Sequence, residues 1–368
     1  MKKSMISLLL AGIMALSGCS ALLEREYVEV VPYEPVSSSN ADSSTLRAQS
    51  YQELVNAVMH LVSEGEERGV INLYNYTAQD AERDLSRACL EVVQEDPLGA
   101  YAVDYIRYES SLIVSYFEVT VNITYRRTLE QMDSIISVTG SNALRQELQN
   151  ALTSFSSGAT LKVSYFTADE KYIHELAEDA YFSTPTSALG KPEVTVSIYP
   201  DTGYQRIVEI ELLWPESTET LRRHSEDLKE LAANLITEKI SAEKLYSMIR
   251  TNLTVTTEGE NSTPYDALFG KKADSMGLAL AYQILCDQAG LKCHLVHGQL
   301  DGTTHYWNII SEDDGETWRH MDLSTELLSL TDEELVETGA YRWDNEKYPS
   351  CLAPELPPDD ENIENNPE

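Results

Sequence analysis

Histidines gather in the C-terminal third of the chain, where four of the seven fall between His294 and His320. Such a cluster could bind zinc, because neutral imidazole is a common metal ligand. His294 and His297 are an odd number of residues apart in an expected strand, however, so their side chains should point to opposite faces. The Cys/His spacing of a structural zinc site is also missing. The sequence therefore predicts no metal and no cofactor.

These histidines belong to a segment, residues 263–322, that carries most of the information about function. It contains four blocks in order along the chain: Gly270–Tyr282, Ala289–Gly298, His305–Ile310 and Trp318–Asp322. Their order and spacing resemble the transglutaminase-like superfamily, in particular its bacterial surface and secreted members. The resemblance extends from Glu219 to near Cys351 and implies a papain-like α+β domain.

The resemblance also implies roles for individual residues. In that family a cysteine at a helix N-terminus is the nucleophile, a histidine on a strand takes its proton, and an aspartate on the next strand orients the imidazole. His305 matches the histidine and Asp322 matches the aspartate. The residues that match supporting positions of the family motifs are Gly277, Trp307, Asn308 and Trp318.

The nucleophile position departs from the family pattern, because residue 275 is a serine. Cys286 cannot replace it, since it lies roughly 16 Å further along a helix axis at 1.5 Å per residue. Cys293 matches a cysteine that is structural in the family. A thiol can be drawn into an ion pair with histidine near neutral pH, whereas a serine hydroxyl cannot. The substitution therefore favours a catalytically silent domain over an active enzyme.

Three functional hypotheses follow. The first is a cell-surface lipoprotein whose degenerate transglutaminase-like domain binds a peptide, a protein or a cell-wall polymer. The second is an active amidase, protease or acyl transferase that uses Ser275, His305 and Asp322. The third is a structural assembly module. Retention of His305 and Asp322 argues against the third hypothesis and does not separate the first two.

The N-terminus predicts where the protein resides. A basic start, Met1–Lys3, precedes an apolar stretch from Met5 to Leu16 that is too short to span a bilayer. Residues 16–19, Leu-Ser-Gly-Cys, resemble the lipobox of bacterial lipoproteins. We expect residues 1–18 to be a signal peptide, with Cys19 lipidated and the protein held on the extracellular or periplasmic side of a bacterial membrane. An ordinary secretory signal is the alternative.

The charge of the 368-residue chain excludes one class of partner. It has 61 Asp and Glu residues against 27 Lys and Arg, which gives a formal net charge of −34. A chain this acidic, without a basic patch, is repelled by phosphate backbones. The sequence therefore predicts no nucleic-acid partner.

The rest of the chain divides into a tether, a duplicated region and a tail. Residues 71–78 match residues 161–168 at an offset of 90, and a helix follows each, at Gln79–Gln94 and Asp169–Phe182. Strands then follow at 102–108 and 112–125 in the first copy, and at 194–199 and 206–214 in the second. Each copy reads β-α-β-β after a leading helix, Tyr51–Ser63 or Thr128–Ser154. We take this region as two packing or binding modules.

The predicted fold class is α+β. The predicted domains are a flexible tether over residues 19–46, α/β repeats over 47–127 and 128–215, a transglutaminase-like domain over 216–352 and a disordered acidic tail over 353–368. After Cys19, the cysteines are Cys89, Cys286, Cys293 and Cys351. All three full pairings stay open. Cys286 and Cys293 could bridge, although such cysteines are more often buried and free.

Overall fold

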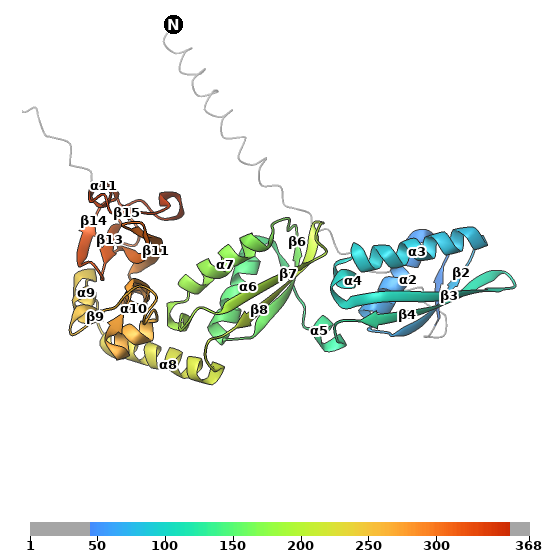
Figure 1. Ribbon diagram of the computed structural model, residues 1–368, viewed down its shortest axis with the longest axis horizontal. Coiled ribbons are helices and arrows are strands. Elements are labelled where there is room, and N and C mark those ends of the chain that lie inside the picture. Colours follow the sequence, from blue (N-terminus) through green and yellow to red (C-terminus); the bar gives the residue numbers. More distant parts are fainter. Residues whose placement is uncertain (1–44, 354–368) are drawn as a thin grey trace, which may run out of the picture.

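The computed structural model describes residues 45–353. The predicted signal peptide, Cys19, most of the tether and nearly all of the tail lie outside this range. The described chain forms three units that follow one another along the long axis of the molecule: unit 1 (residues 45–127), unit 2 (128–215) and unit 3 (216–353) (Figure 1). No helix within residues 45–353 combines the length and apolar character that crossing a membrane requires.

Unit 1 is a four-stranded sheet with its helices packed on one face. In chain order its elements are β1 (Thr45–Ala48), α2 (Tyr51–Ser63), β2 (Arg68–Leu73), α3 (Ala78–Gln94), α4 (Pro97–Ala102), β3 (Val103–Ile113) and β4 (Tyr116–Tyr125). The sheet order is β1-β2-β4-β3, with β1 parallel to β2 and the other pairs antiparallel. Leu54 of α2, Leu85 of α3 and Ile71 of β2 are fully buried in one hydrophobic cluster.

Unit 2 has the same arrangement. Its elements are α5 (Leu129–Asp133), β5 (Ile136–Thr139), α6 (Gly140–Ser154), β6 (Gly158–Ser164), α7 (Glu170–Phe182), η1 (Pro185–Ser187), β7 (Glu193–Tyr199) and β8 (Gln205–Leu213). The sheet order is β5-β6-β8-β7, with β5 parallel to β6. Leu46 pairs with Ile71 in unit 1, and Ile136 pairs with Leu161 in unit 2, at the same offset of 90 residues. This common topology supports the duplication, which remains a proposal.

Several predicted elements need correction. Thr128–Ser154 is not one helix, because the short strand β5 interrupts it and α6 begins only at Gly140. Each unit therefore reads β-α-β-α-β-β, with a parallel edge strand that the β-α-β-β prediction left out. The first of these edge strands begins at Thr45, inside the predicted tether. The strand break expected at 109–111 is missing as well, since β3 continues to Ile113.

Unit 3 places a buried helix against a five-stranded antiparallel sheet. Its elements are α8 (Thr218–Leu235), α9 (Ala242–Arg250), β9 (Thr254–Val255), η2 (Asp266–Gly270), β10 (Lys272–Ala273), α10 (Ser275–Ala289), β11 (Lys292–Leu300), β12 (Thr303–Ser311), β13 (Arg319–Asp322), β14 (Leu327–Leu330), α11 (Asp332–Glu337), β15 (Tyr341–Arg342) and η3 (Asn345–Lys347). The sheet order is β14-β13-β12-β11-β15. Eleven of the fifteen α10 residues are buried, so this helix forms the centre of the unit.

The hydrophobic cores of units 2 and 3 run into each other. Leu280 of α10 and Leu295 of β11 pack in the same cluster as the helices of unit 2. Phe155 and Leu189 of unit 2 lie in the cluster around α10. Unit 1 meets unit 2 through a smaller cluster, made of Tyr101, Ala102, Met132 and Ile207. Units 2 and 3 are therefore consecutive segments of the chain, but the hydrophobic core continues across residues 215/216.

Candidate functional site

The helix N-terminus that carries Ser275 is built by Asp274. The carboxylate of Asp274 caps α10 by accepting from the backbone N–H of Gly277 at 2.9 Å, and its second oxygen accepts from the N–H of Gly259 at 2.9 Å and from the hydroxyl of Ser262. A Cβ at Gly277 would lie 2.8 Å from the carbonyl oxygen of Asn261, so only glycine lets the loop approach this closely. The cap thus fixes the loop of residues 256–262 (the capping loop) against Ser275.

His305 and Asp322 form a tight pair on neighbouring antiparallel strands, β12 and β13. The Nε2 atom of His305 lies 2.7 Å from Oδ2 of Asp322, and both side chains are buried. Asp322 also accepts from the hydroxyls of Ser324 and Tyr341, each at 2.7 Å. Burial alone would raise the pKa of Asp322, but the hydrogen bonds from His305, Ser324 and Tyr341 outweigh it and lower that pKa. Asp322 is therefore ionised.

The carboxylate of Glu258 lies between His305 and Ser275. Its Oε1 is 3.0 Å from Nδ1 of His305, and its Oε2 accepts from the Ser275 hydroxyl at 2.8 Å. The Ser275 oxygen in turn accepts from the backbone N–H of Tyr306 at 3.1 Å. The structure corrects the direct contact between histidine and nucleophile that the family resemblance implies, because the capping loop places the Glu258 carboxylate between His305 and Ser275.

His305 is a cation held by two carboxylates. Burial lowers the pKa of its imidazole, but the hydrogen bonds to Asp322 and Glu258 dominate and raise that pKa to about 9. Both ring nitrogens therefore carry protons at neutral pH, and both donate to carboxylate oxygens. In this state neither nitrogen has a lone pair with which to accept a proton from Ser275.

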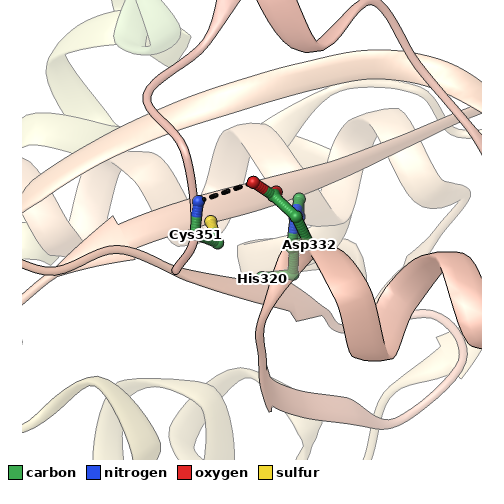
Figure 2. A group of neighbouring side chains, drawn as sticks. All are labelled: His320, Asp332 and Cys351. Carbon is green, nitrogen blue, oxygen red and sulfur yellow. Dashed lines mark hydrogen bonds and ion pairs between the residues drawn. The ribbon is translucent and has the colours of Figure 1, made fainter. Parts of the chain in front are cut away.

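A second cluster, His320, Asp332 and Cys351, offers three possible metal ligands whose atoms lie within 4.8 Å of one another (Figure 2). The Trp307 indole N–H donates to Nδ1 of His320 at 3.0 Å. Indole only donates, so the proton of the neutral imidazole sits on Nε2, which is 2.8 Å from Asp332. Burial lowers the pKa of His320, which keeps it neutral. The Nε2 lone pair is thus unavailable to a metal, and these residues do not fit one.

The same cluster instead ties the C-terminal segment to the sheet. The backbone N–H of Cys351 donates to Asp332 Oδ2 at 2.9 Å, and the N–H of Asp332 donates to the Cys351 carbonyl at 2.8 Å. Burial raises the pKa of the Cys351 thiol to about 12, so it is not a thiolate near neutral pH. Among residues 45–353 all four cysteines are free and buried. None of the three possible disulfide pairings is therefore formed among these four cysteines.

Comparison with known proteins assigns the region that holds the site. Residues 228–323 match the family model of the transglutaminase-like superfamily. The chain contains a transglutaminase-like domain. This match includes Glu258, Ser275, His305 and Asp322, and the observed mixture of helices and sheets is the α+β class expected from the sequence.

Solved structures similar to the chain share little sequence with it. One, described as a candidate cysteine protease from Cytophaga hutchinsonii, has 11% identity and a TM-score of 0.24 over 37% of this chain and 63% of its own. A structure described as a TGase has 10% identity and a TM-score of 0.23 over 78% of this chain and 60% of its own. A candidate protease from Parabacteroides distasonis has 9% identity and a TM-score of 0.22, over 72% and 44%. No curated protein matches the chain.

The supporting residues of the transglutaminase-like domain differ in what they contact. Asn308 donates to the backbone carbonyl of Ala279 at 3.0 Å and so fastens α10 to β12. Trp307 is buried, and its ring lies 6.2 Å from the His305 ring in a stacked arrangement. Trp318 instead donates to the Gly315 carbonyl in the loop before β13. This hydrogen bond does not involve His305 or Asp322. Trp318 therefore stabilises the loop before β13 and not the histidine–aspartate pair.

Glu258 is the site residue that sequence reasoning missed. It follows two threonines in the capping loop, where neither periodicity nor a motif distinguishes it from Glu260 two residues later. Only the fold brings it next to Ser275, 17 residues away, and His305, 47 residues away. An acidic residue before a glycine in the loop that caps α10 was the one available signal.

Proposed function

We propose that the protein is a cell-surface lipoprotein whose transglutaminase-like domain binds a ligand without catalysing its conversion. The observation that carries the proposal is the double ion pair at His305, with carboxylate oxygens 2.7 Å and 3.0 Å from its two ring nitrogens. A general base must have an unprotonated nitrogen within reach of the nucleophile. The imidazole held by Asp322 and Glu258 has none at neutral pH.

The position of Ser275 supports the same proposal. Its side chain donates to Glu258 and accepts from Tyr306, and the residue is 1% exposed. A substrate carbonyl could not approach the hydroxyl oxygen while Glu258 stays in place, because attack needs the reacting atoms about 3–3.5 Å apart. Serine also lacks the acidity that lets a cysteine ionise at this kind of helix N-terminus.

Two measurements test the catalytic part of the proposal. A fluorophosphonate probe should leave Ser275 of the full chain unlabelled, and peptide substrates should stay intact. The His305 ring, followed by NMR through a pH titration, should titrate with a midpoint of about 9. Labelling at Ser275 that Ser275→Ala abolishes, or peptide cleavage with the same dependence, would show that the protein is an enzyme.

An active serine hydrolase is the second candidate, and the retained His305–Asp322 pair is the observation that favours it. In Ser-His-Asp enzymes the aspartate fixes the imidazole tautomer, and a contact of 2.7 Å is suited to that role. Such an enzyme would need Glu258 to withdraw so that His305 could reach Ser275. If so, Glu258→Ala should gain fluorophosphonate labelling at Ser275, whereas the non-catalytic proposal expects none.

The lipoprotein part of the proposal rests on the lipobox at residues 16–19. Labelling of cells with a palmitate analogue should mark the wild-type protein at Cys19. Cys19→Ala should abolish the label, while Cys89→Ala, which removes a buried thiol of unit 1, should leave it unchanged. Equal labelling of the wild type and Cys19→Ala would exclude the lipid anchor.

A further inference from the structure

The structure assigns a ligand chemistry to this site: we propose that it is a carboxylate receptor, occupied within the chain by Glu258, and that a peptide bearing a free carboxylate binds by displacing that side chain. The inference rests on the proposed binding function and deepens it. It follows from the two groups that contact the carboxylate oxygens of Glu258, and from the burial of these groups compared with that of Glu258.

Two buried donors from the framework of the domain converge on one carboxylate. The Ser275 hydroxyl, at the start of α10, donates to one oxygen at 2.8 Å, and Nδ1 of His305, on β12, lies 3.0 Å from the other. Ser275 is 1% exposed and His305 is 4% exposed, whereas the Glu258 side chain is 32% exposed. The donors are therefore part of the rigid core, and the acceptor is the component that faces solvent.

The polarity of both donors is fixed, which selects a carboxylate over an amide. The Ser275 oxygen accepts from the Tyr306 N–H, and its own proton is donated to the ligand position, where Glu258 now accepts it. His305 donates from Nε2 to Asp322, and its second N–H points to the same position. A carboxylate offers an acceptor to each donor, while a primary amide would place an N–H against one of them. The positive charge of His305 favours an anion further.

Glu258 can leave without opening the capping loop. The loop is held by the Gly259 N–H and the Ser262 hydroxyl on Asp274, and by the Asp274 N–H on the Asn261 carbonyl. These contacts involve neighbours of Glu258 and not its carboxylate. Rotation of one long side chain would therefore leave both donors without an acceptor, and an incoming carboxylate would replace the two hydrogen bonds that Glu258 gives up.

The test is chemical rescue in the full-length protein. Glu258→Ala removes the CH₂COO⁻ part of the side chain, and acetate has the size of the missing group. The titratable groups that face His305 are Asp322 from β13, Tyr341 from β15 and Glu258 from the capping loop. Glu258→Ala should lower the NMR titration midpoint of His305 by at least one pH unit. Saturating acetate should restore most of that shift, and acetamide should restore none.

Matched variants keep the result interpretable. Glu260→Ala, in the same loop and exposed, should leave the midpoint of His305 and its response to acetate as in the wild type. Glu258→Gln removes the charge and one of the two acceptors, so it should also lower the midpoint of His305. A midpoint in Glu258→Ala that acetate does not move, in a protein whose NMR spectrum is otherwise folded, would overturn the carboxylate assignment.

The source of the natural carboxylate is distinguished with two peptide mimics. N-acetyl-glutamate amide presents an acidic side chain, and N-acetyl-glycine presents a chain terminus. Rescue by either compound in Glu258→Ala supports the proposal and identifies the source, and rescue by neither overturns it. Fluorophosphonate labelling of wild-type Ser275 would instead overturn the non-catalytic function, so the two failures are distinct.

Discussion

Asp322 and Glu258 together change the protonation chemistry of His305. A free histidine has a pKa near 6.5, and the value of about 9 for His305 corresponds to a stabilisation on the order of 3 kcal/mol, since one pKa unit is 1.36 kcal/mol. The folded-state pKa lies above the unfolded one. The contribution is therefore full below about pH 6.5 and is lost as pH rises through about 9. The stabilisation from His305 should therefore decrease as pH rises toward and above about 9.

At the residue scale, a cysteine at position 275 reports on both Glu258 and His305. In Ser275→Cys the buried thiol lies beside the Glu258 carboxylate, which disfavours a thiolate, so we expect slow alkylation by iodoacetamide at pH 7. In Ser275→Cys combined with Glu258→Ala, the helix N-terminus and the His305 cation stabilise the thiolate, and alkylation should be at least tenfold faster. Mass spectrometry of timed samples gives both rates.

The matched control for this experiment is Ser275→Cys combined with Glu260→Ala, which should react as slowly as Ser275→Cys alone. A fast single variant would mean that Glu258 does not cover residue 275. Equal, slow rates in all three proteins would mean that something other than Glu258 closes the site.

The sequence motifs identified three residues of the site, Ser275, His305 and Asp322. They did not identify Glu258, which only the folded chain brings next to them. Ser275 begins α10, and His305 and Asp322 lie on adjacent strands, because the blocks that contain them also encode a helix start and two strands. Glu258 has no such context. The contact of His320 with Asp332 was likewise hidden, since the two residues belong to no shared spacing pattern and meet only when α11 packs beside β13.

Among the elements, the β3–β4 hairpin has a turn residue that is poorly suited to its backbone. Val114 is 99% exposed and has φ 52°, a left-handed conformation that β-branched residues rarely adopt. Asparagine tolerates this region better. Val114→Asn should therefore stabilise unit 1 by about 0.5–1 kcal/mol in urea denaturation. Leu112→Asn, at an exposed strand position of the same hairpin, should give no such gain; if it does, polarity and not conformation is responsible.

Element boundaries were predictable where one pattern dominates. Tyr51–Ser63 is helical with the same bounds that its apolar spacing predicts, because Ser50 caps it and six apolar residues face the core. Thr128–Ser154 failed because it mixes two signals. Ile136 and Val138 alternate as in a strand, and Gly140 has positive φ at the start of the next helix. The long amphipathic helix that follows them, α6, masked this four-residue strand.

At the scale of the whole molecule, the shared core predicts how the protein unfolds. Leu280 of α10 is fully buried among side chains of unit 2, whereas Leu85 of α3 packs only within unit 1. We expect calorimetry to resolve one transition for unit 1 and a joint transition for units 2 and 3. Leu280→Ala should destabilise the joint transition by about 2–5 kcal/mol, and Leu85→Ala should destabilise the other by a similar amount.

Two outcomes would contradict these expected transitions. If Leu280→Ala shifts a transition of unit 3 and leaves unit 2 unchanged, the two cores are energetically separate despite their contact. If Leu85→Ala shifts both transitions, the small cluster around Tyr101 couples all three units.

The continuous core across residue 215 also bears on how such a protein can change over evolutionary time. A recombination event that moved the transglutaminase-like region alone into another gene would carry Leu280 and Leu295 without the side chains that cover them. The heritable module is therefore the pair of units 2 and 3. Unit 1, joined by the smaller cluster around Tyr101 and by the Arg127–Glu209 ion pair, is the part that shuffling could remove, duplicate or replace at the lower cost.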